Sequence, residues 1–175
     1  MITATTSDEQ LMLDFQQGSR EAFAELFCRY RDPIYGFFRR RLYEFARAEE
    51  LAQEAFLAVL KGVARYEPRA TFRTYLYGIA FNLLAAERRK PISLNVAVQD
   101  APEPGSGVET EVWVRQALEK LDWRDREILL LREYEQFSYA EIADVVKAPV
   151  NTVRSRLFRA RMALKDLLVP QQGLS

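Results

Sequence analysis

Apolar residues recur at intervals of three and four positions along most of the chain. This spacing marks one face of an α-helix, whereas a strand would need a period of two that no stretch sustains. In the first half, the pattern predicts helices over about 20–44, 47–66 and 72–90, with Pro33 expected to strain or split the first. Ser7, three residues before Gln10, predicts the start of another short helix. The expected fold class is therefore all-α.

A segment rich in proline and glycine separates these helices from a second helical group. The helix breakers in it are Pro91, Pro102, Pro104, Gly105 and Gly107. After this segment, the pattern predicts helices over 112–121, 123–135, 137–146 and 150–168. We therefore expect two small helical domains, 1–90 and 112–175, joined by a flexible linker at 91–111.

The formal net charge is zero, with 25 Lys and Arg against 25 Asp and Glu, but the charges are unevenly spread. Residues 20–90 hold 14 basic and 9 acidic side chains, and residues 137–175 hold 6 basic and 3 acidic ones. The linker between them holds four acidic side chains and no basic one. Two cationic regions flank an acidic one, so a net charge of zero does not argue against nucleic-acid binding.

The composition excludes several kinds of catalytic and metal site. The sequence has no histidine and one cysteine, so it lacks the usual base or ligand of Ser-His-Asp, Cys-His, zinc-protease and di-iron sites. Neither a phosphate-binding glycine loop nor a dinucleotide fingerprint is present. We therefore expect a protein that is not an enzyme and that uses no metal, no cofactor and no small-molecule substrate. No apolar run approaches ~18 residues and the start, MITATTSDEQ, lacks a signal-peptide pattern, so a cytoplasmic protein without membrane insertion is expected.

The segment 138–154 carries the most informative pattern in the chain. It reads Ser-Tyr-Ala-Glu-Ile-Ala-Asp-Val-Val-Lys-Ala-Pro-Val-Asn-Thr-Val-Arg. Ile142, Ala143 and Val146 give its first helix an apolar inner face, and Ala143 is small enough for a second helix to cross closely. A three-residue break ends at Pro149, which suits only the first turn of a helix. The pattern predicts a helix-turn-helix.

On the helix predicted at 150–168, apolar and basic residues fall on opposite faces. At ~100° per residue, one stripe holds Val150, Val153, Leu157, Ala160, Leu164 and Leu167. The other side holds Asn151, Arg154, Ser155, Phe158, Arg159, Met162 and Lys165. In a DNA major groove, Arg can pair with guanine and Phe can contact a thymine methyl group. A solvated basic helix is the alternative interpretation, but the helix and turn before it favour DNA contact.

The helix predicted at 72–90 mixes aromatic and basic residues. Its predicted apolar stripe holds Phe72, Leu76, Ile79, Leu83 and Ala86. The residues away from this stripe are Arg73, Thr74, Tyr77, Phe81 and Arg88, with Asn82 at the edge. Aromatic rings among cations suit a single strand, because rings stack on bases while cations follow the backbone. Packing of Tyr77 and Phe81 on a neighbouring helix is an equally good interpretation of this segment alone.

Two further features of the first half have ordinary explanations. Glu50 and Glu54 share a helix face, and without a third ligand a solvated or protein-binding face is favoured over a metal site. Cys28 lies among Phe23, Leu26 and Phe27 and is expected to be buried as a small apolar residue.

Four motifs in a fixed order point to a known family. They are Ala48–Phe56, Phe72-Arg-Thr-Tyr-Leu-Tyr-Gly-Ile-Ala-Phe-Asn-Leu-Leu, Leu121-Asp-Trp-Arg-Asp-Arg-Glu-Ile-Leu-Leu-Leu-Arg, and the run from Phe137 to Arg161. Over about 8–90 and 112–168, the chain resembles the extracytoplasmic-function (ECF) sigma factors, the small two-domain class of bacterial sigma factors. The resemblance implies binding to core RNA polymerase, through the β′ clamp helices and the β subunit, and to promoter DNA. It also implies an anti-sigma factor as a partner.

The resemblance assigns roles to individual positions. Binding to the β′ clamp helices falls on Glu50, Gln53 and Glu54. Capture and melting of the −10 element, including a flipped base held by the loop 66–71, fall on Tyr66, Arg69, Thr71, Arg73, Tyr77, Phe81, Asn82 and Arg88. Reading of the −35 element falls on Asn151, Thr152, Arg154, Ser155, Arg156, Phe158 and Arg159. Lys61, Pro68 and Asn151 depart from the usual family residues.

Two other classes of protein fit parts of the sequence. An autonomous helix-turn-helix regulator would bind duplex DNA tightly without polymerase, usually as a dimer on two half-sites. An α-helical adaptor with incidental basic faces would have no specific effect on DNA. The ECF sigma factor interpretation predicts weak DNA binding by the free chain and strong promoter binding only with core polymerase.

Overall fold

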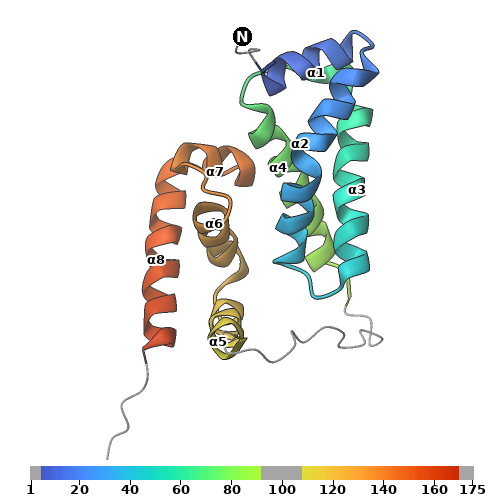
Figure 1. The fold of residues 1–175 in the computed structure, drawn as a ribbon. Coiled ribbons are helices and arrows are strands. Elements are labelled where there is room, and N and C mark those ends of the chain that lie inside the picture. The colour runs from blue at the N-terminus through green and yellow to red at the C-terminus, as the bar shows by residue number, and fades with distance from the viewer. Residues whose placement is uncertain (1–4, 92–107, 170–175) are drawn as a thin grey trace, which may run out of the picture. The chain divides into compact units, whose positions relative to one another are not determined.

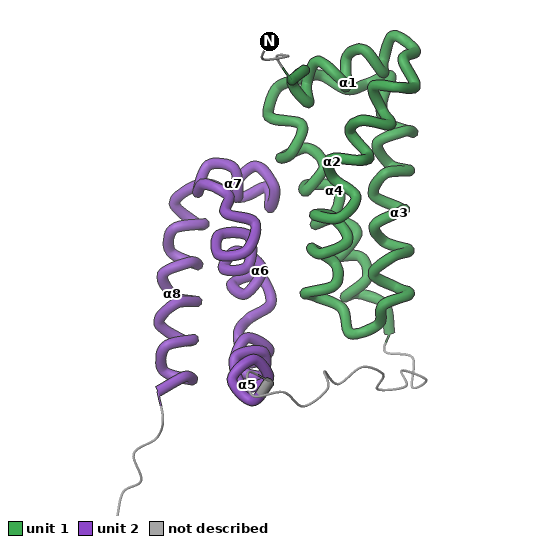
Figure 2. The backbone as a smooth tube through the Cα atoms, viewed as in Figure 1, with its two compact units in different colours: residues 1–100 green, residues 101–175 purple. Residues whose placement is uncertain are grey.

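The computed structural model describes residues 5–91 and 108–169, and within these ranges every regular element is a helix. The chain is all-α, as the sequence predicts. It divides into two compact units, residues 1–100 and 101–175 (Figure 2). Residues 92–107, which make up most of the expected linker, lie outside the described part, so the expected domain limits at 90 and 112 stay predictions.

Over residues 5–91, the first unit contains four α-helices and a short 3-10 turn (Figure 1). They are α1 (Asp8–Gln16), α2 (Arg20–Arg39), α3 (Phe45–Gly62), the turn Val63–Arg65 and α4 (Phe72–Arg88). The predicted cap at Ser7 is confirmed, because its hydroxyl accepts from the N–H of Gln10, and Ser19 caps α2 in the same way. Leu26, Phe37, Leu51 and Leu76 are fully buried and form part of the core that joins α2, α3 and α4.

Helix α2 continues through Pro33, so the expected split does not occur. A proline inside a helix costs about 3 kcal/mol through its missing N–H and its steric clash. Ile34, Phe37 and Phe38 are fully buried directly after it. Burial of each such side chain contributes about 1.5–3 kcal/mol, which outweighs the cost of the proline. The helix ends at Arg39 rather than near residue 44, and Arg41 then folds back to donate to the carbonyl of Phe37 at 3.0 Å.

Cys28 is exposed, so the expectation that it is buried is wrong. The buried positions of α2 include Ala22, Leu26 and Ile34, which repeat at multiples of four residues along one face. Cys28 follows Leu26 by two positions, which is about 200° around the helix, so it lies on the opposite side.

The second unit contains α5 (Val108–Glu119), α6 (Trp123–Glu133), α7 (Tyr139–Val146) and α8 (Val150–Leu168). Helix α5 begins four residues before the predicted start at 112, within the segment expected to be linker. Helix α6 is central to the core, with Ile128, Leu129, Leu130 and Leu131 all buried. Within the described residues, no helix combines the length and the apolar character needed to cross a membrane.

The helix-turn-helix is formed by α7 and α8. A capping box between Ser138 and Glu141 starts α7, and Lys147 ends it in the left-handed conformation at φ 55°. Pro149 is the N-cap of α8, as the break at 147–149 predicts. Ile142 and Ala143 are buried as expected, but Val145 rather than Val146 completes the inner face.

Candidate nucleic-acid interface

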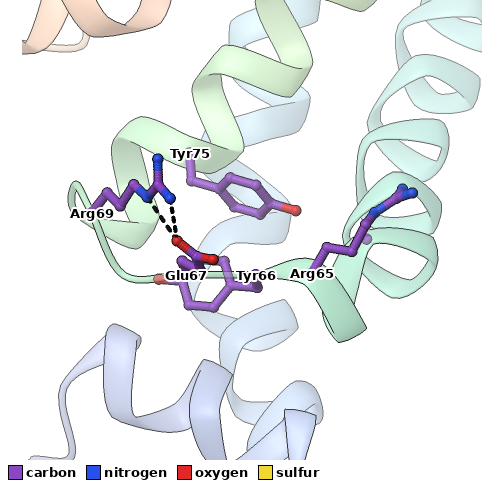
Figure 3. A pocket seen from close by; sticks show the side chains of 6 residues that line it. Arg65, Tyr66, Glu67, Arg69 and Tyr75 are labelled. Atoms are coloured by element: carbon purple, nitrogen blue, oxygen red, sulfur yellow. Dashed lines mark hydrogen bonds and ion pairs between the residues drawn. The ribbon is translucent and has the colours of Figure 1, made fainter.

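A pocket of about 410 Å³ lies in the first unit between the end of α3 and the start of α4 (Figure 3). Its lining residues are Gly62, Arg65, Tyr66, Glu67, Arg69 and Tyr75. The rings of Tyr66 and Tyr75 meet edge to face, with centroids 5.1 Å apart. Glu67 accepts from Nε of Arg69 at 2.7 Å on one side of the Tyr75 ring, and Arg65 lies on the other (Figure 3). The pocket therefore offers an aromatic wall, cationic donors and one carboxylate.

Backbone and side-chain contacts hold this pocket in shape. A Cβ atom on Gly62 would lie 2.9 Å from the Tyr75 hydroxyl, so glycine is what lets that ring approach. Helix α1 secures the surrounding segment, because Gln16 Nε2 donates to the carbonyls of Val63 at 2.9 Å and Tyr66 at 3.2 Å. Burial is the main reason that the pKa of Tyr66 rises to about 12, so its phenol stays neutral at physiological pH.

The structure places Tyr77 in the core rather than on a DNA-facing surface. Its side chain is 3% exposed and its ring packs edge to face on Phe37, with centroids 5.6 Å apart. The reason is that the buried face of α4 runs through Phe72, Leu76, Tyr77, Ala80 and Leu84, rotated from the predicted stripe. Ile79 and Leu83 are only half-buried and Ala86 is exposed. Of the two interpretations left open for Tyr77, packing on a neighbouring helix is the correct one.

The other residues predicted to contact the −10 element are spread around α4 and the loop before it. Thr71 caps α4 by accepting from the N–H of Thr74 at 3.2 Å, and Arg69 and Asn82 are exposed. The residues that are half-buried are Arg73, Phe81 and Arg88, and Tyr66 is buried under the pocket. The predicted set is therefore divided between exposed, half-buried and buried positions, and only Tyr66 and Arg69 of it line the pocket.

In the second unit, α8 presents the side chains that its sequence pattern places outward. Asn151, Arg154 and Ser155 are exposed and Thr152 is half-buried. Phe158 is 69% exposed, which is unusual for a phenylalanine and leaves its ring available for contact. Val153, Leu157 and Ala160 fix the helix from the opposite side, since all three are fully buried.

Arg156 and Arg159 differ from the rest of this face because both bind Asp125 in α6. Arg156 Nη1 lies 2.9 Å from Asp125 Oδ1, and Arg159 Nε lies 3.0 Å from Oδ2. The three side chains border a cavity of about 570 Å³ with Asp122, Trp123 and Arg124. Both arginines are thus tied to α6 through Asp125, with Arg156 largely covered and Arg159 still 61% exposed.

The acidic face of α3 also carries apolar side chains. Glu50 and Gln53 are exposed, while Arg47 Nη1 lies 2.7 Å from Glu50 and 3.4 Å from Glu54. Leu57 is 50% exposed and Leu60 is 39% exposed on the same side of the helix. A mixed acidic and apolar surface of this kind is typical of a protein-binding face.

Three groups of residues in these sites were missed by reasoning from the sequence. Tyr75 lines the pocket, whereas Tyr77 is buried, and placing the buried stripe of α4 through Ala80 and Leu84 would have identified this difference. Leu57 and Leu60 extend the acidic face of α3. Asp125 binds two arginines of α8, but no local pattern in the sequence links residues 31 and 34 positions apart.

Two family models match the chain. The model described as Sigma-70 region 2 matches residues 26–90, and the model described as Sigma-70, region 4 matches residues 111–164. The first match covers the pocket and the acidic face of α3, and the second covers the helix-turn-helix.

Relatives and solved structures match over nearly the whole chain. The RNA polymerase sigma-H factor of Pseudomonas aeruginosa is 35% identical, over 93% of this chain and 94% of its own. The ECF RNA polymerase sigma-E factor of Escherichia coli K12 is 31% identical, over 94% of this chain and 95% of its own.

Two solved structures share the fold. The structure of CnrH in complex with the cytosolic domain of CnrY has a TM-score of 0.75 at 24% identity and covers 93% of this chain and 97% of its own. The sigma factor RpoE of Bartonella quintana, in complex with the anti-sigma factor NepR, has a TM-score of 0.68 at 21% identity. The match covers 86% of this chain and 98% of that sigma factor. The chain therefore belongs to the ECF sigma factors, which initiate transcription at specific promoters.

Proposed function

We propose that this sigma factor opens promoters by combining two separate DNA contacts. The second unit reads the −35 element as duplex, and the first unit holds an unpaired base of the −10 element. Melting costs a few kcal/mol for each unstacked step, and capture of the exposed base offsets part of that cost. The chain itself carries out no bond chemistry, which is left to the polymerase.

The pocket between α3 and α4 is the proposed site of the captured base. Its volume of about 410 Å³ falls in the range of small-molecule sites. An exposed base can stack on the half-buried ring of Tyr75, which the buried Tyr66 supports edge to face, while Arg65 and Arg69 attract the phosphates of the same strand. Arg73, Thr71, Asn82 and Arg88 are proposed to guide the adjoining strand. Tyr77 is not included, because it is buried.

The outward face of α8 is the proposed reader of the −35 element. Arg154 is proposed to pair with a guanine and Phe158 to contact a thymine methyl group, and the exposure of both side chains supports these roles. Asn151, Thr152 and Ser155 lie at the start of the helix and are suited to phosphate or base-edge contacts. Arg156 and Arg159 complete the proposed set, with Arg156 as a phosphate contact.

The acidic face of α3 is the proposed docking site for the β′ clamp helices of core polymerase. Glu50, Gln53 and Glu54 would supply polar contacts, with Leu57 and Leu60 as the apolar part of the same surface. The β subunit is a further proposed contact, and the cytoplasm is the proposed compartment because core polymerase acts there. An anti-sigma factor is also a proposed partner, since the Bartonella quintana sigma factor with this fold was solved bound to one.

The observation that carries this proposal is the exposed, aromatic and basic face of α8 on a helix-turn-helix, in one chain with the loop pocket. Run-off transcription with core polymerase and a randomised promoter library tests it. Start sites that depend on the chain and share −35 and −10 sequences are expected. Tight operator binding by the free chain, with no new start sites, would instead indicate an autonomous regulator.

A further inference from the structure

Asp125 is a buried carboxylate directly beneath the proposed DNA-reading helix. It lies in the first turn of α6, three residues after the N-cap Asp122, and its side chain is only 9% exposed. Its Oδ1 accepts from Arg156 Nη1 at 2.9 Å and from Arg159 Nη2 at 3.1 Å, while Oδ2 accepts from Arg159 Nε at 3.0 Å. Both carboxylate oxygens therefore accept hydrogen bonds from side chains of α8.

The contact with Arg159 is bidentate and fixes the plane of its guanidinium group. A guanidinium carries five N–H donors in a rigid fork. Asp125 accepts from the N–H of Nε and from one N–H of Nη2. Three N–H donors remain, two on Nη1 and one on Nη2. These remaining donors form the outer edge of the group, and Arg159 is still 61% exposed. An edge with two parallel donors is the arrangement that pairs with O6 and N7 of guanine.

The environment of Asp125 also favours its ionised form. Burial alone would raise the pKa of Asp125, but hydrogen bonds from Arg159 and Arg156 outweigh this and hold the pKa below its ordinary value. The carboxylate stays ionised at physiological pH, and its position in the first turn of α6 is favoured by the helix dipole. Arg159 is thus oriented before DNA arrives and loses less rotamer freedom on binding.

We propose that Asp125 is a positioning residue for promoter recognition: it holds Arg159 so that the outer guanidinium edge reads one guanine of the −35 element. This inference rests on the proposed function, because it assumes that α8 enters the −35 major groove. It adds a residue from a different helix to that function and assigns it control over specificity at one base pair.

A second ion pair between the same two helices provides a matched control. Glu133 in α6 accepts from Arg161 Nη2 in α8 at 2.9 Å, and both side chains are largely exposed. If the carboxylates of α6 served only to join the helices, loss of either would act in the same way. If Asp125 orients a reading side chain, only its loss would change which sequences are read.

The test uses the full chain with core polymerase and a promoter in which each −35 base pair is varied in turn. Asp125→Asn keeps the shape of the side chain but presents an amide to Arg159 and breaks the bidentate contact. Run-off yields are compared for the wild type, Asp125→Asn, Arg159→Ala, the double variant and Glu133→Gln, with thermal unfolding of each. Asp125→Glu, which keeps the charge, is the second variant if the first does not fold.

The expected result is a loss of guanine discrimination at one −35 base pair. Arg159→Ala and Asp125→Asn should each reduce it roughly tenfold, and the double variant no further. Glu133→Gln should keep the guanine discrimination of the wild type. Asp125→Glu should retain more of this discrimination than Arg159→Ala.

Two results would overturn the inference alone. The first is unchanged guanine discrimination in Asp125→Asn. The second is stronger initiation by Asp125→Asn at every sequence with discrimination intact, because this would mean that Asp125 merely neutralises the charge of Arg159. A wild-type chain that yields no start sites overturns the proposed function itself, which is a distinct outcome.

Discussion

Glu9, in the first turn of α1, accepts a hydrogen bond of 2.7 Å from the backbone N–H of Phe72, which begins α4 sixty-three residues later. Gln16, near the other end of α1, binds the carbonyls of Val63 and Tyr66. Helix α1 therefore secures both ends of the segment that carries the pocket. This helix lies before the part of the chain that the Sigma-70 region 2 model matches.

Removing either contact from α1 should loosen the pocket loop. Gln16→Ala and Glu9→Ala are each expected to lower the free energy of unfolding by about 1–2 kcal/mol, because they leave backbone groups without their side-chain partners. Initiation at double-stranded promoters whose −10 element differs from the preferred sequence should fall more than initiation at a pre-melted template. Gln10→Ala is the control, since Gln10 bonds only to Asp14 of its own helix among the hydrogen bonds of its side chain described here. Equal effects of Gln10→Ala and Gln16→Ala would contradict the role of α1.

The two tyrosines of α4 are predicted to behave in opposite ways. Tyr77→Ala should reduce stability by about 3 kcal/mol or more, because it leaves a cavity beside Phe37. Tyr75→Ala should cost less stability and should instead weaken binding of single-stranded −10 DNA by the complex with polymerase. Chemical denaturation and a fluorescent-oligonucleotide binding assay separate the two effects. A Tyr75→Ala variant with normal strand binding would place the captured base elsewhere.

A similar contrast applies to neighbouring positions on α8. Phe158→Ala and Arg154→Ala should leave stability nearly unchanged, since both side chains are exposed. Each should weaken −35-dependent initiation by ~1–3 kcal/mol if the contact is direct. Leu157→Ala, one residue away but buried, should instead cost about 2–5 kcal/mol of stability. Normal initiation by both surface variants would show that the wrong face of α8 was assigned.

Between about pH 2 and 8, the stability of the fold should depend on pH only at the acid end. Hydrogen bonds from Arg47 are the main reason that the pKa of Glu87 falls to about 2, and the pKa of Asp125 is lowered as well. A carboxylate with a depressed folded-state pKa contributes its full stability above its unfolded pKa of about 4.3 and loses it as the pH falls toward 2. Because the sequence has no histidine, little change is expected between about pH 5.5 and 8.

Thermal unfolding followed by circular dichroism at a series of pH values measures this dependence. Glu87→Gln removes the titrating group from its ion pair with Arg47 and should give a shallower fall in stability below about pH 4. A midpoint transition near neutral pH, or an unchanged acid slope in Glu87→Gln, would show that other groups control the acid response.

Local patterns were sufficient to predict the helices and the helix-turn-helix. Ser7, Ser19 and Pro149 act through neighbours within four residues, so their roles follow from the sequence. The continuation of α2 through Pro33 could not be predicted from the local sequence, because it depends on apolar side chains that pack against residues of other helices. The same holds for Tyr77, whose burial is decided by Phe37 forty positions earlier.

The candidate sites show the same division. The exposure of Phe158 and Arg154 follows from helical periodicity alone, because the opposite stripe is strongly apolar. The shape of the loop pocket depends on Gly62, Tyr75 and the side chains of α1, which are brought together only by the fold. The pairing of Asp125 with Arg159 likewise joins two helices whose register no local pattern reveals.

The exposure of Cys28 on α2 makes the unmodified chain suitable for spectroscopy. It is the single cysteine in the sequence, so a thiol-reactive fluorophore or spin label would attach at one known position without any substitution. A label there would report on the first unit only. Its polarity and mobility would follow the capture of the factor by polymerase, or its release, in real time.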